Sequence, residues 1–251
     1  MRVAVAGATG LVGSHVVEAL RRRGLEVVAL ARSLGVDLLD GSGLDAALGG
    51  VGAVIDVTNT DAVDPDEAVA FFSTVTSNLL AAEQRAGVGH HVALSIVGVD
   101  ALTGNGHYDG KRAQEQLVDD GPVPFTIQLA AEFFEYAEMA LHWSTEDGRA
   151  TIAPLMLQPV AVSDVAGVLA DIATGVPQGR AVDVVGPSRL DLVEMVRRLL
   201  AARGESVEIT ASWEDGALGT DLADQDFLPS DGARIAPTSF DSWIEHTAAG
   251  S

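Results

Sequence analysis

The chain has 251 residues, 47% of them hydrophobic and 20% charged, which is enough to bury a sizeable core and excludes a largely disordered protein. Its formal charge of −21, from 36 acidic and 15 basic residues, repels phosphate backbones, so we expect no nucleic-acid partner for this acidic protein. The absence of cysteine excludes disulfides and thiolate chemistry. No apolar run reaches the roughly 20 residues that a membrane span needs, so we expect a cytoplasmic protein without membrane contact.

The first predicted elements form a strand–helix–strand unit. Residues 2–6 predict a buried strand, residues 7–13 a tight glycine turn, residues 11–23 a helix that ends at Gly24, and residues 26–31 a second strand. The alternation continues with strands at 53–57, 91–96 and 125–129 and with helices at 65–85 and 109–118. Strands that are apolar on both faces and alternate with helices predict an α/β fold, a doubly wound parallel sheet with helices on both sides.

Beyond about residue 135 the alternation weakens. Helices are predicted at 163–174 and 190–203, and the acidic, Gly- and Asp-rich segment 214–234 predicts a long loop or a lid. We expect a single domain (1–251), with a dinucleotide-binding core at 1–135 and a smaller substrate-side C-terminal region at 136–251.

The glycine turn lies directly after a strand and opens a helix. In this position the first glycine permits a tight turn, the second lets the backbone approach a pyrophosphate, and the third allows close packing of the helix on the sheet. The turn therefore predicts a dinucleotide site. Its expected contact residues are Gly7, Thr9, Gly10, Leu11, Val12 and Gly13.

The end of the second strand bears on the choice of dinucleotide. A carboxylate there would accept hydrogen bonds from a ribose 2′-hydroxyl, whereas an arginine accommodates a 2′-phosphate. The sequence has Arg32 and Ser33, with no carboxylate before Asp37, which favours NADP(H) over NAD(H).

Four sequence stretches together resemble the atypical short-chain dehydrogenase/reductases, close to the NmrA-like subgroup. They are Gly7 to Gly13, Val57-Thr58-Asn59, Leu94 to Gly98 and Lys111 to Glu115. The resemblance implies a Rossmann fold that binds NAD(P); many members of the family are reductases and some are non-catalytic redox sensors. The segment between Arg32 and Asp37 is shorter than in the family, which implies that a helix and part of a strand are missing there.

The same resemblance extends the expected cofactor site. It implies that Asp37 and Leu38 contact the adenine and that Val57, Thr58 and Asn59 line the adenosine and ribose. Further expected cofactor contacts are Ser95, Lys111, Leu129 and Ala130.

The resemblance also implies a catalytic group. Family reductases use a Ser or Thr after a strand and a Tyr four residues before a Lys, which holds the nicotinamide ribose and lowers the pKa of the Tyr. Ser95 and Lys111 are present, but His107 is four residues before Lys111 and Tyr108 three. Both lie on the face of Lys111 if this segment is helical. A lysine ammonium lowers the pKa of a phenol and disfavours a protonated imidazole, which favours Tyr108 as the proton donor. Position in the motif favours His107. A third interpretation is that neither residue transfers a proton.

Lys111 is the only lysine of the chain, which indicates a requirement for a compact ammonium at this position. The apolar stretch after residue 129 either packs in the core or walls a substrate pocket. The expected pocket residues are Val97, Glu132, Phe133 and Phe134. His90 and His91 lack carboxylates at ligand spacing, so we expect surface or capping groups and no metal.

These observations predict an NADP(H)-dependent oxidoreductase that reduces a small carbonyl, enone or quinone by hydride transfer. Two alternatives stay open: a non-catalytic NADP(H)-sensing regulatory protein, and an isomerase or cyclase that retains the nucleotide. The expected partner is a small-molecule substrate, and the expected state is a monomer or a small homo-oligomer.

Overall fold

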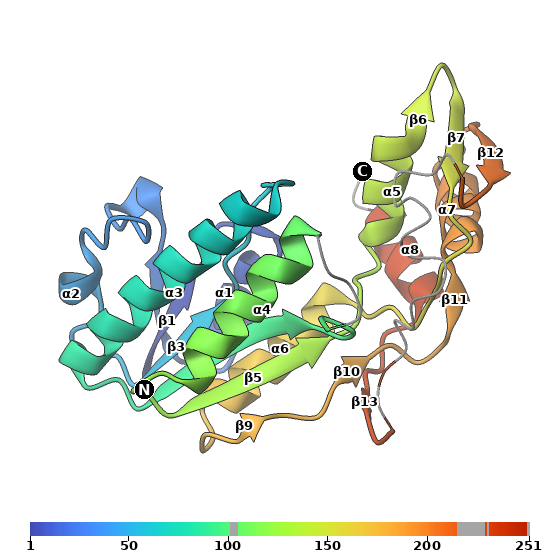
Figure 1. The fold of residues 1–251 in the computed structure, drawn as a ribbon. Helices are drawn as coiled ribbons and strands as arrows, with labels where there is room; N and C mark the ends of the chain where they lie inside the picture. The colour runs from blue at the N-terminus through green and yellow to red at the C-terminus, as the bar shows by residue number, and fades with distance from the viewer. Residues whose placement is uncertain (101–104, 215–228, 230, 250–251) are drawn as a thin grey trace. The chain divides into compact units, whose positions relative to one another are not determined.

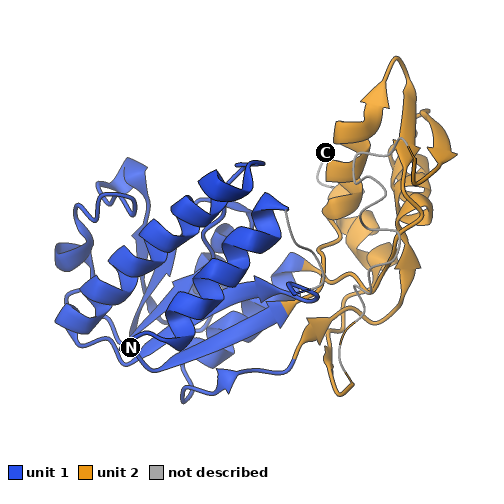
Figure 2. Cartoon of the chain, viewed as in Figure 1, with its two compact units in different colours: residues 1–129, 162–182 blue, residues 130–161, 183–251 orange. Residues whose placement is uncertain are grey.

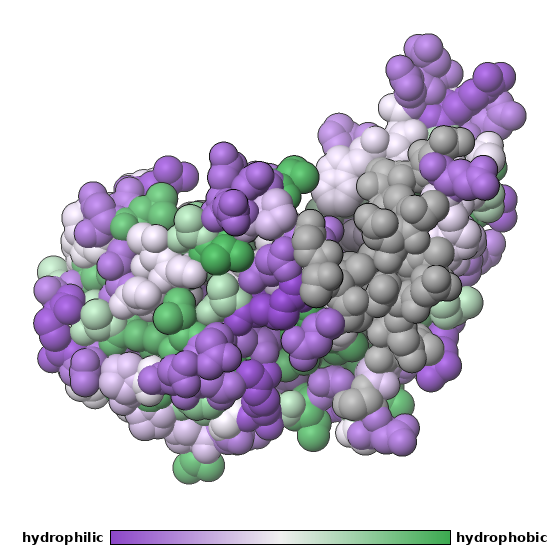
Figure 3. Space-filling model, viewed as in Figure 1, coloured by the Kyte–Doolittle hydropathy of each residue, from purple (hydrophilic) through white to green (hydrophobic). Residues whose placement is uncertain are grey.

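The computed structural model describes residues 1–100, 105–214, 229 and 231–249. The chain forms two compact units (Figure 2): unit 1 comprises Met1–Leu129 and Val162–Val182, and unit 2 comprises Ala130–Ala161 and Asp183–Ser251. Unit 1 thus overlaps the predicted core over residues 1–129 and also takes in 162–182. Figure 3 shows hydrophilic residues over much of the visible face of unit 1, interspersed with smaller apolar patches. None of the described helices is long and apolar enough to cross a membrane.

Unit 1 is built on a sheet whose strands follow the order β5-β4-β3-β1-β2. Strand β1 (Arg2–Ala6) pairs in parallel with β2 (Glu26–Leu30) and β3 (Ala53–Asp56), and β3 pairs in parallel with β4 (His90–Ile96). Strand β5 (Phe125–Ala130) follows β4, and the short β9 (Gly179–Arg180) pairs with β5. The carboxyl ends of β1, β3 and β4 therefore meet at one edge of the sheet, where open α/β sheets bind their ligands.

Helices cover both faces of this sheet. Figure 1 shows α3 (Pro65–Ala86) and α4 (Gly106–Asp119) on one face, with α1 (Leu11–Arg22) and α6 (Val162–Ala173) on the other. Val3 to Ala6 of β1 are fully buried because the strand has a helix layer on each side. The arrangement confirms the predicted doubly wound parallel sheet of the Rossmann class.

Local signals account for the helix ends. Asp64 caps α3 by accepting a hydrogen bond from the Glu67 amide, with Pro65 in the first turn, and Gly87 ends that helix at a φ of 72°. The side chain of Asn105 accepts a hydrogen bond from the His107 amide, so α4 begins at Gly106, three residues before the predicted start. On the opposite face, Arg23 pairs with Asp171 of α6 at 2.7 Å.

The connection between β2 and β3 is short, as the sequence resemblance implies. Residues 31–52, all described, contain only the 3-10 turn η1 (Arg32–Leu34) and the one-turn helix α2 (Leu44–Ala47), and no strand. Leu44 and Leu48 are buried there against the core that β1 and α3 share. These two leucines anchor the short connection to the core of unit 1.

Unit 2 combines helices with short strands. Helix α5 (Tyr136–Ser144) precedes a three-stranded sheet in the order β12-β7-β6, and α7 (Leu192–Arg203) and α8 (Phe240–Ala249) complete the unit. The strands are β6 (Thr145–Glu146), β7 (Arg149–Ile152), β8 (Met156–Leu157), β10 (Val184–Val185), β11 (Leu190–Asp191), β12 (Glu208–Ala211) and β13 (Arg234–Ile235). Most of the predicted loop or lid at 214–234 lies outside the described residues.

Candidate active site

The glycine turn after β1 has the geometry that a dinucleotide requires. Gly7 adopts a φ of +79°, and a Cβ there would lie 2.9 Å from the Val57 carbonyl oxygen. A Cβ on Gly13 would lie 2.1 Å from the Gly7 carbonyl oxygen, so this glycine lets α1 pack closely on the turn. A Cβ on Gly10 would meet only the Gly7 oxygen at 3.4 Å. Gly10 is exposed, so the turn leaves open space beside it.

The start of α1 fits a pyrophosphate. Gly10 is the N-cap residue, and within the described residues no side chain caps the helix and no carboxylate lies in its first turn. The first amides of α1 therefore point outward without a protein acceptor, which is the arrangement that binds anionic phosphates. Thr9 and Leu11 are exposed beside these amides, and Val12 is half-buried.

The residues expected to select the dinucleotide follow β2. Arg32 and Ser33 lie on η1 and are exposed, and Arg32 forms no ion pair with any described residue. Asp37 instead supports its own loop, because its Oδ1 accepts a hydrogen bond from the Leu39 amide at 2.8 Å. Leu38 is half-buried and packs against the core of unit 1.

A buried chain of hydrogen bonds lies at the carboxyl end of β3. Asp56 accepts hydrogen bonds through Oδ1 from the amide (2.9 Å) and hydroxyl (2.7 Å) of Thr58, inside the stretch Val57 to Asn59. Its Oδ2 accepts from Nε2 of Gln114 at 2.8 Å. The Lys111 ammonium donates to Oε1 of Gln114 and lies 5.0 Å from the centre of the Phe72 ring. The chain thus joins Lys111 to the predicted cofactor loop.

Lys111 is only 4% exposed, although lysine is almost never fully buried unless it is paired. Burial lowers the pKa of Lys111 from 10.5 to about 8, against the opposing effects of the Asp56 and Glu115 carboxylates. The ammonium can therefore release its proton close to neutral pH. This property suits a group that works beside a reacting proton donor.

Ser95 belongs to a second cluster, in which Ser95 and Glu115 are buried and Arg180 is exposed. Its hydroxyl donates a hydrogen bond to Oε1 of Glu115, and Oε2 of Glu115 accepts from Arg180 at 2.6 Å. Arg180 also pairs with Asp119 at 2.7 Å. The Ser95 proton is therefore engaged by Glu115. Glu115 follows Lys111 by one helical turn, a spacing that is the only sequence signal of its role.

His107 and Tyr108 lie at the start of α4, with their rings edge to face at a centroid distance of 6.0 Å. Burial, together with the nearby Lys111 ammonium, lowers the pKa of His107 to about 4. His107 is therefore neutral at pH 7 and carries no excess proton to donate. Tyr108 is buried, at 8% exposure.

The predicted pocket residues fall in different units. Val97 is buried in unit 1, where Leu129 is half-buried, while Ala130, Glu132, Phe133 and Phe134 belong to unit 2. Phe134 is 1% exposed and packs against Phe240 and Trp243, with ring centroids 5.2 and 5.8 Å away. The core-packing interpretation therefore holds for Phe134. Phe133 and Glu132 are half-buried.

The prediction for the adjacent histidines was wrong. His90 and His91 are both buried rather than exposed. Nε2 of His90 lies 2.8 Å from the Thr126 hydroxyl, and Nδ1 of His91 lies 2.9 Å from Oε1 of Glu83. Both partners come from other elements, Thr126 from β5 and Glu83 from α3, and the local sequence around the two histidines does not indicate them. The described residues contain no group of side chains that could hold a metal ion.

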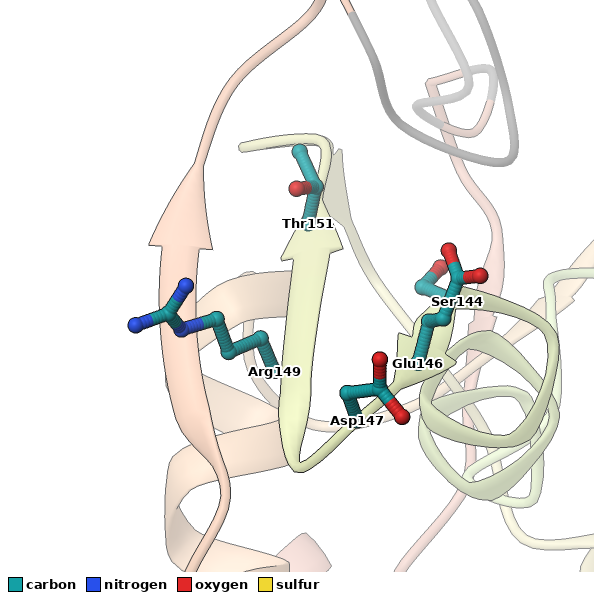
Figure 4. Close-up of a pocket in the computed structure, with 5 residues that line it drawn as sticks. All are labelled: Ser144, Glu146, Asp147, Arg149 and Thr151. Atoms are coloured by element: carbon teal, nitrogen blue, oxygen red, sulfur yellow. The ribbon is translucent and has the colours of Figure 1, made fainter.

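A surface pocket of about 420 Å³ lies in unit 2 (Figure 4). It lies at the end of α5 and the β6–β7 hairpin, and its lining residues are Ser144, Glu146, Asp147, Arg149 and Thr151. Arg149 is engaged by Glu208 at 2.9 Å. None of the predicted site residues lines this pocket.

Comparison with known proteins decides the family. The sequence profile of the NAD dependent epimerase/dehydratase family matches residues 3–127. The chain is also 30% identical over 234 residues to a (4-alkanoyl-5-oxo-2,5-dihydrofuran-3-yl)methyl phosphate reductase of Streptomyces griseus, covering 86% of this chain and 78% of the relative. The chain belongs to the NAD-dependent epimerase/dehydratase family. This confirms the predicted relation to the atypical short-chain dehydrogenase/reductases; the NmrA-like subgroup stays a prediction.

Solved structures agree on the fold. A short-chain dehydrogenase/reductase superfamily protein of Agrobacterium tumefaciens with bound NAD superposes with a TM-score of 0.74 at 18% identity, covering 99% of this chain and 96% of the other. An NADPH-dependent quinone oxidoreductase of Escherichia coli gives a TM-score of 0.70 at 17% identity, covering 98% and 99%. Family membership and the reductase relative make this chain an NAD(P)-dependent enzyme with an oxidoreductase role.

Proposed function

We propose that this protein is an NADPH-dependent reductase that transfers hydride to a small carbonyl, enone or quinone substrate. The observation that carries the proposal is the buried Lys111, joined through Gln114 and Asp56 to the loop that holds Thr58. Burying an ammonium costs free energy even when it is hydrogen-bonded, so a buried lysine at the edge where the parallel strands end favours a role in binding and catalysis.

The substrate class draws on the Streptomyces relative. The compound in that protein's name carries a ring double bond conjugated to carbonyl groups, which is an enone. Reduction of such a substrate adds one hydride and one proton and converts NADPH to NADP⁺. NADPH supplies the hydride when it is bound, so the residues of this chain must hold the substrate and supply the proton.

We assign the proton to Tyr108 in preference to His107. Tyr108 lies three residues before Lys111 on α4, so the two share a helix face, and its phenol carries a proton at neutral pH. His107 is neutral at pH 7 and donates less readily beside the same ammonium. Lys111 would orient the nicotinamide ribose. Ser95 would polarise the substrate oxygen, which requires its hydroxyl to turn away from Glu115.

The preference for NADPH rests on Arg32. Its exposed guanidinium has no ion-pair partner among the described residues, and the nearest following carboxylate, Asp37, is engaged with the Leu39 amide. An exposed, unpaired arginine at this place favours a 2′-phosphate over a 2′-hydroxyl.

Calorimetric titration of nucleotide-free protein with NADPH, NADP⁺, NADH and NAD⁺ tests the proposal. We expect tight binding of the phosphorylated pair, and Arg32→Ala should remove most of the preference. Arg21→Ala is the matched control. Arg21 is also an exposed arginine, but it lies in the last turn of α1, at the opposite end of the helix from the expected pyrophosphate site. Absence of binding for all four nucleotides would overturn the proposal.

Turnover distinguishes the reaction classes. We expect NADPH oxidation to be coupled to loss of an α,β-unsaturated carbonyl or quinone substrate, with one NADPH consumed per product. Conversion of substrate without net NADPH consumption would contradict a reductase and indicate an isomerase or cyclase that retains the nucleotide.

A further inference from the structure

We propose that Gln114 and Asp56 are positioning residues that hold the Lys111 ammonium and the Thr58 loop in one fixed arrangement. This inference rests on the proposed function, in which Lys111 and the loop face the cofactor. It gives a role to two residues outside the Ser, Tyr and Lys pattern: Asp56, and Gln114 within the stretch Lys111 to Glu115.

The polarity of the hydrogen-bond chain requires a neutral amide in its centre. The Lys111 ammonium can only donate, and the ionised Asp56 carboxylate can only accept. Gln114 accepts from Lys111 through Oε1 and donates to Asp56 through Nε2, at 2.8 Å. Both ends therefore fix the orientation of the Gln114 side chain.

The chain connects two different elements. Lys111 and Gln114 belong to α4, whereas Asp56 ends β3. The second oxygen of Asp56 accepts two hydrogen bonds from Thr58 and so sets the turn of the following loop. A displacement of the Gln114 amide would release the ammonium and the loop together.

Burial argues against a purely structural purpose. Asp56 and Gln114 are both 0% exposed and Lys111 is 4% exposed. Well-packed apolar side chains in place of such a buried charged pair are often neutral or stabilising, so stability alone does not require these polar groups. Pre-organisation of a catalytic group does, because its geometry must be held by the residues around it.

Several charged groups surround Gln114 and bear on any pH test. Glu115 raises the pKa of Lys111 from the same helix. From β4, His91 interacts with both Asp56 and Lys111, and its imidazole is paired with Glu83 of α3. The comparison of variants must therefore be made at matched pH values, with the wild type measured beside each variant.

The decisive variant is Gln114→Leu, with Gln116→Leu as its matched control. Gln116 also donates to an aspartate, Asp120 at 2.7 Å, but on the exposed side of the same helix. Loss of hydrogen bonds to charged groups in Gln114→Leu should weaken NADPH binding and lower kcat, each about tenfold or more. The control should match the wild type in both, and thermal unfolding shows whether each variant is folded.

The single lysine supplies a readout of the Gln114 contact that a general loss of stability would not move. Protein labelled with [ε-¹³C]lysine gives one NMR signal, from Lys111. Gln114 stabilises the ammonium by accepting its hydrogen bond, so its removal should lower the titration midpoint of that signal below the wild-type value of about 8. The Gln116→Leu signal should titrate as in the wild type.

Gln114→Glu adds a test by rescue. A protonated glutamic acid can accept from Lys111 and donate to Asp56, whereas the ionised form faces the Asp56 carboxylate with no proton between them. The kcat of this variant relative to the wild type should therefore rise as the pH falls. If Gln114→Leu does not fold, Gln114→Glu tests the positioning role in its place. A kcat relative to the wild type that does not change with pH would then overturn the inference.

Failure of this inference differs from failure of the proposed function. If Gln114→Leu keeps wild-type NADPH affinity, kcat and lysine titration while Lys111→Met loses NADPH affinity and kcat, the positioning role is wrong and the reductase assignment stands. If Lys111→Met itself keeps wild-type NADPH affinity and kcat, both assignments are wrong.

Discussion

Nδ1 of His91 on β4 lies 2.9 Å from Oε1 of Glu83 on α3, and both side chains are fully buried. Burial by itself lowers the pKa of His91, but the Glu83 carboxylate outweighs it and raises the pKa above its ordinary value. Nε2 of His91 has no hydrogen-bond partner in the described part of the chain. The pair therefore depends on one strong contact inside the core.

Replacing Glu83 by glutamine should destabilise the protein by about 3 kcal/mol at pH 6, because removal of one partner leaves a buried group uncompensated. Since the folded pKa of His91 lies above the unfolded value, its contribution to stability is complete below pH 6.5 and is lost as the pH rises through the folded pKa. Urea unfolding between pH 5.5 and 8.5 should show this decline in the wild type and a weaker one in Glu83→Gln. Glu67→Gln, on the exposed start of α3, should behave as the wild type.

Lys111 should titrate near pH 8 in the folded protein. Its effect on the pH dependence of stability should have the opposite sign to that of His91. The folded pKa lies below the unfolded value of 10.5, so the unfolded chain binds more protons between pH 8 and 10.5. Stability from this group therefore rises with pH through that window, by roughly 3 kcal/mol in total. Denaturant unfolding of the wild type and Lys111→Met across the window checks this; parallel pH profiles would contradict it.

Tyr108→Phe should lower kcat by about a hundredfold or more, the usual cost of losing a general acid. His107→Phe should change kcat less than about threefold at pH 7, since a group with a pKa of about 4 is already unprotonated there. Steady-state kinetics on an accepted substrate makes the comparison. The reverse pattern would move the proton donor to His107, and full activity of both variants would remove both residues from that role.

Gly13→Ala should destabilise the fold by about 3 kcal/mol, because its Cβ would lie 2.1 Å from a backbone oxygen that cannot move freely. Gly10→Ala should fold normally yet bind NADPH about tenfold more weakly, since its Cβ enters the open space where the backbone approaches a pyrophosphate. Gly167→Ala in α6 is the control. A Cβ at this position would meet nothing closer than 3.9 Å, so the substitution should stabilise the helix slightly. Thermal unfolding and calorimetry separate the two effects.

Strong local patterns made the first half of the fold predictable. Strand β1 matches the predicted range, and α1 and α3 differ from theirs by one residue at the end, because each shows clear periodicity and a glycine stop. The short strand β10 at Val184–Val185 has no counterpart among the predicted strands, since short apolar runs outside a βα alternation carry little register information.

The sequence predicted only those residues of the candidate site that belong to a recognisable motif. The glycine turn and Lys111 follow from spacing, but the partners of Lys111 do not. Gln114 lies mid-helix and bonds to Asp56, 58 positions earlier, and no sequence period reports such a tertiary contact. The burial of His91 was missed for the same reason, since Glu83 reaches it from a different element.

The single buried lysine has a practical consequence for protease experiments. A protease that cleaves only after lysine has one target in this chain, the bond between Lys111 and Arg112 inside α4. Since that bond is held in a helix, cutting requires α4 to open. The rate of this one cut, followed with and without nucleotide, would measure how often the helix opens and how far a bound ligand holds it closed.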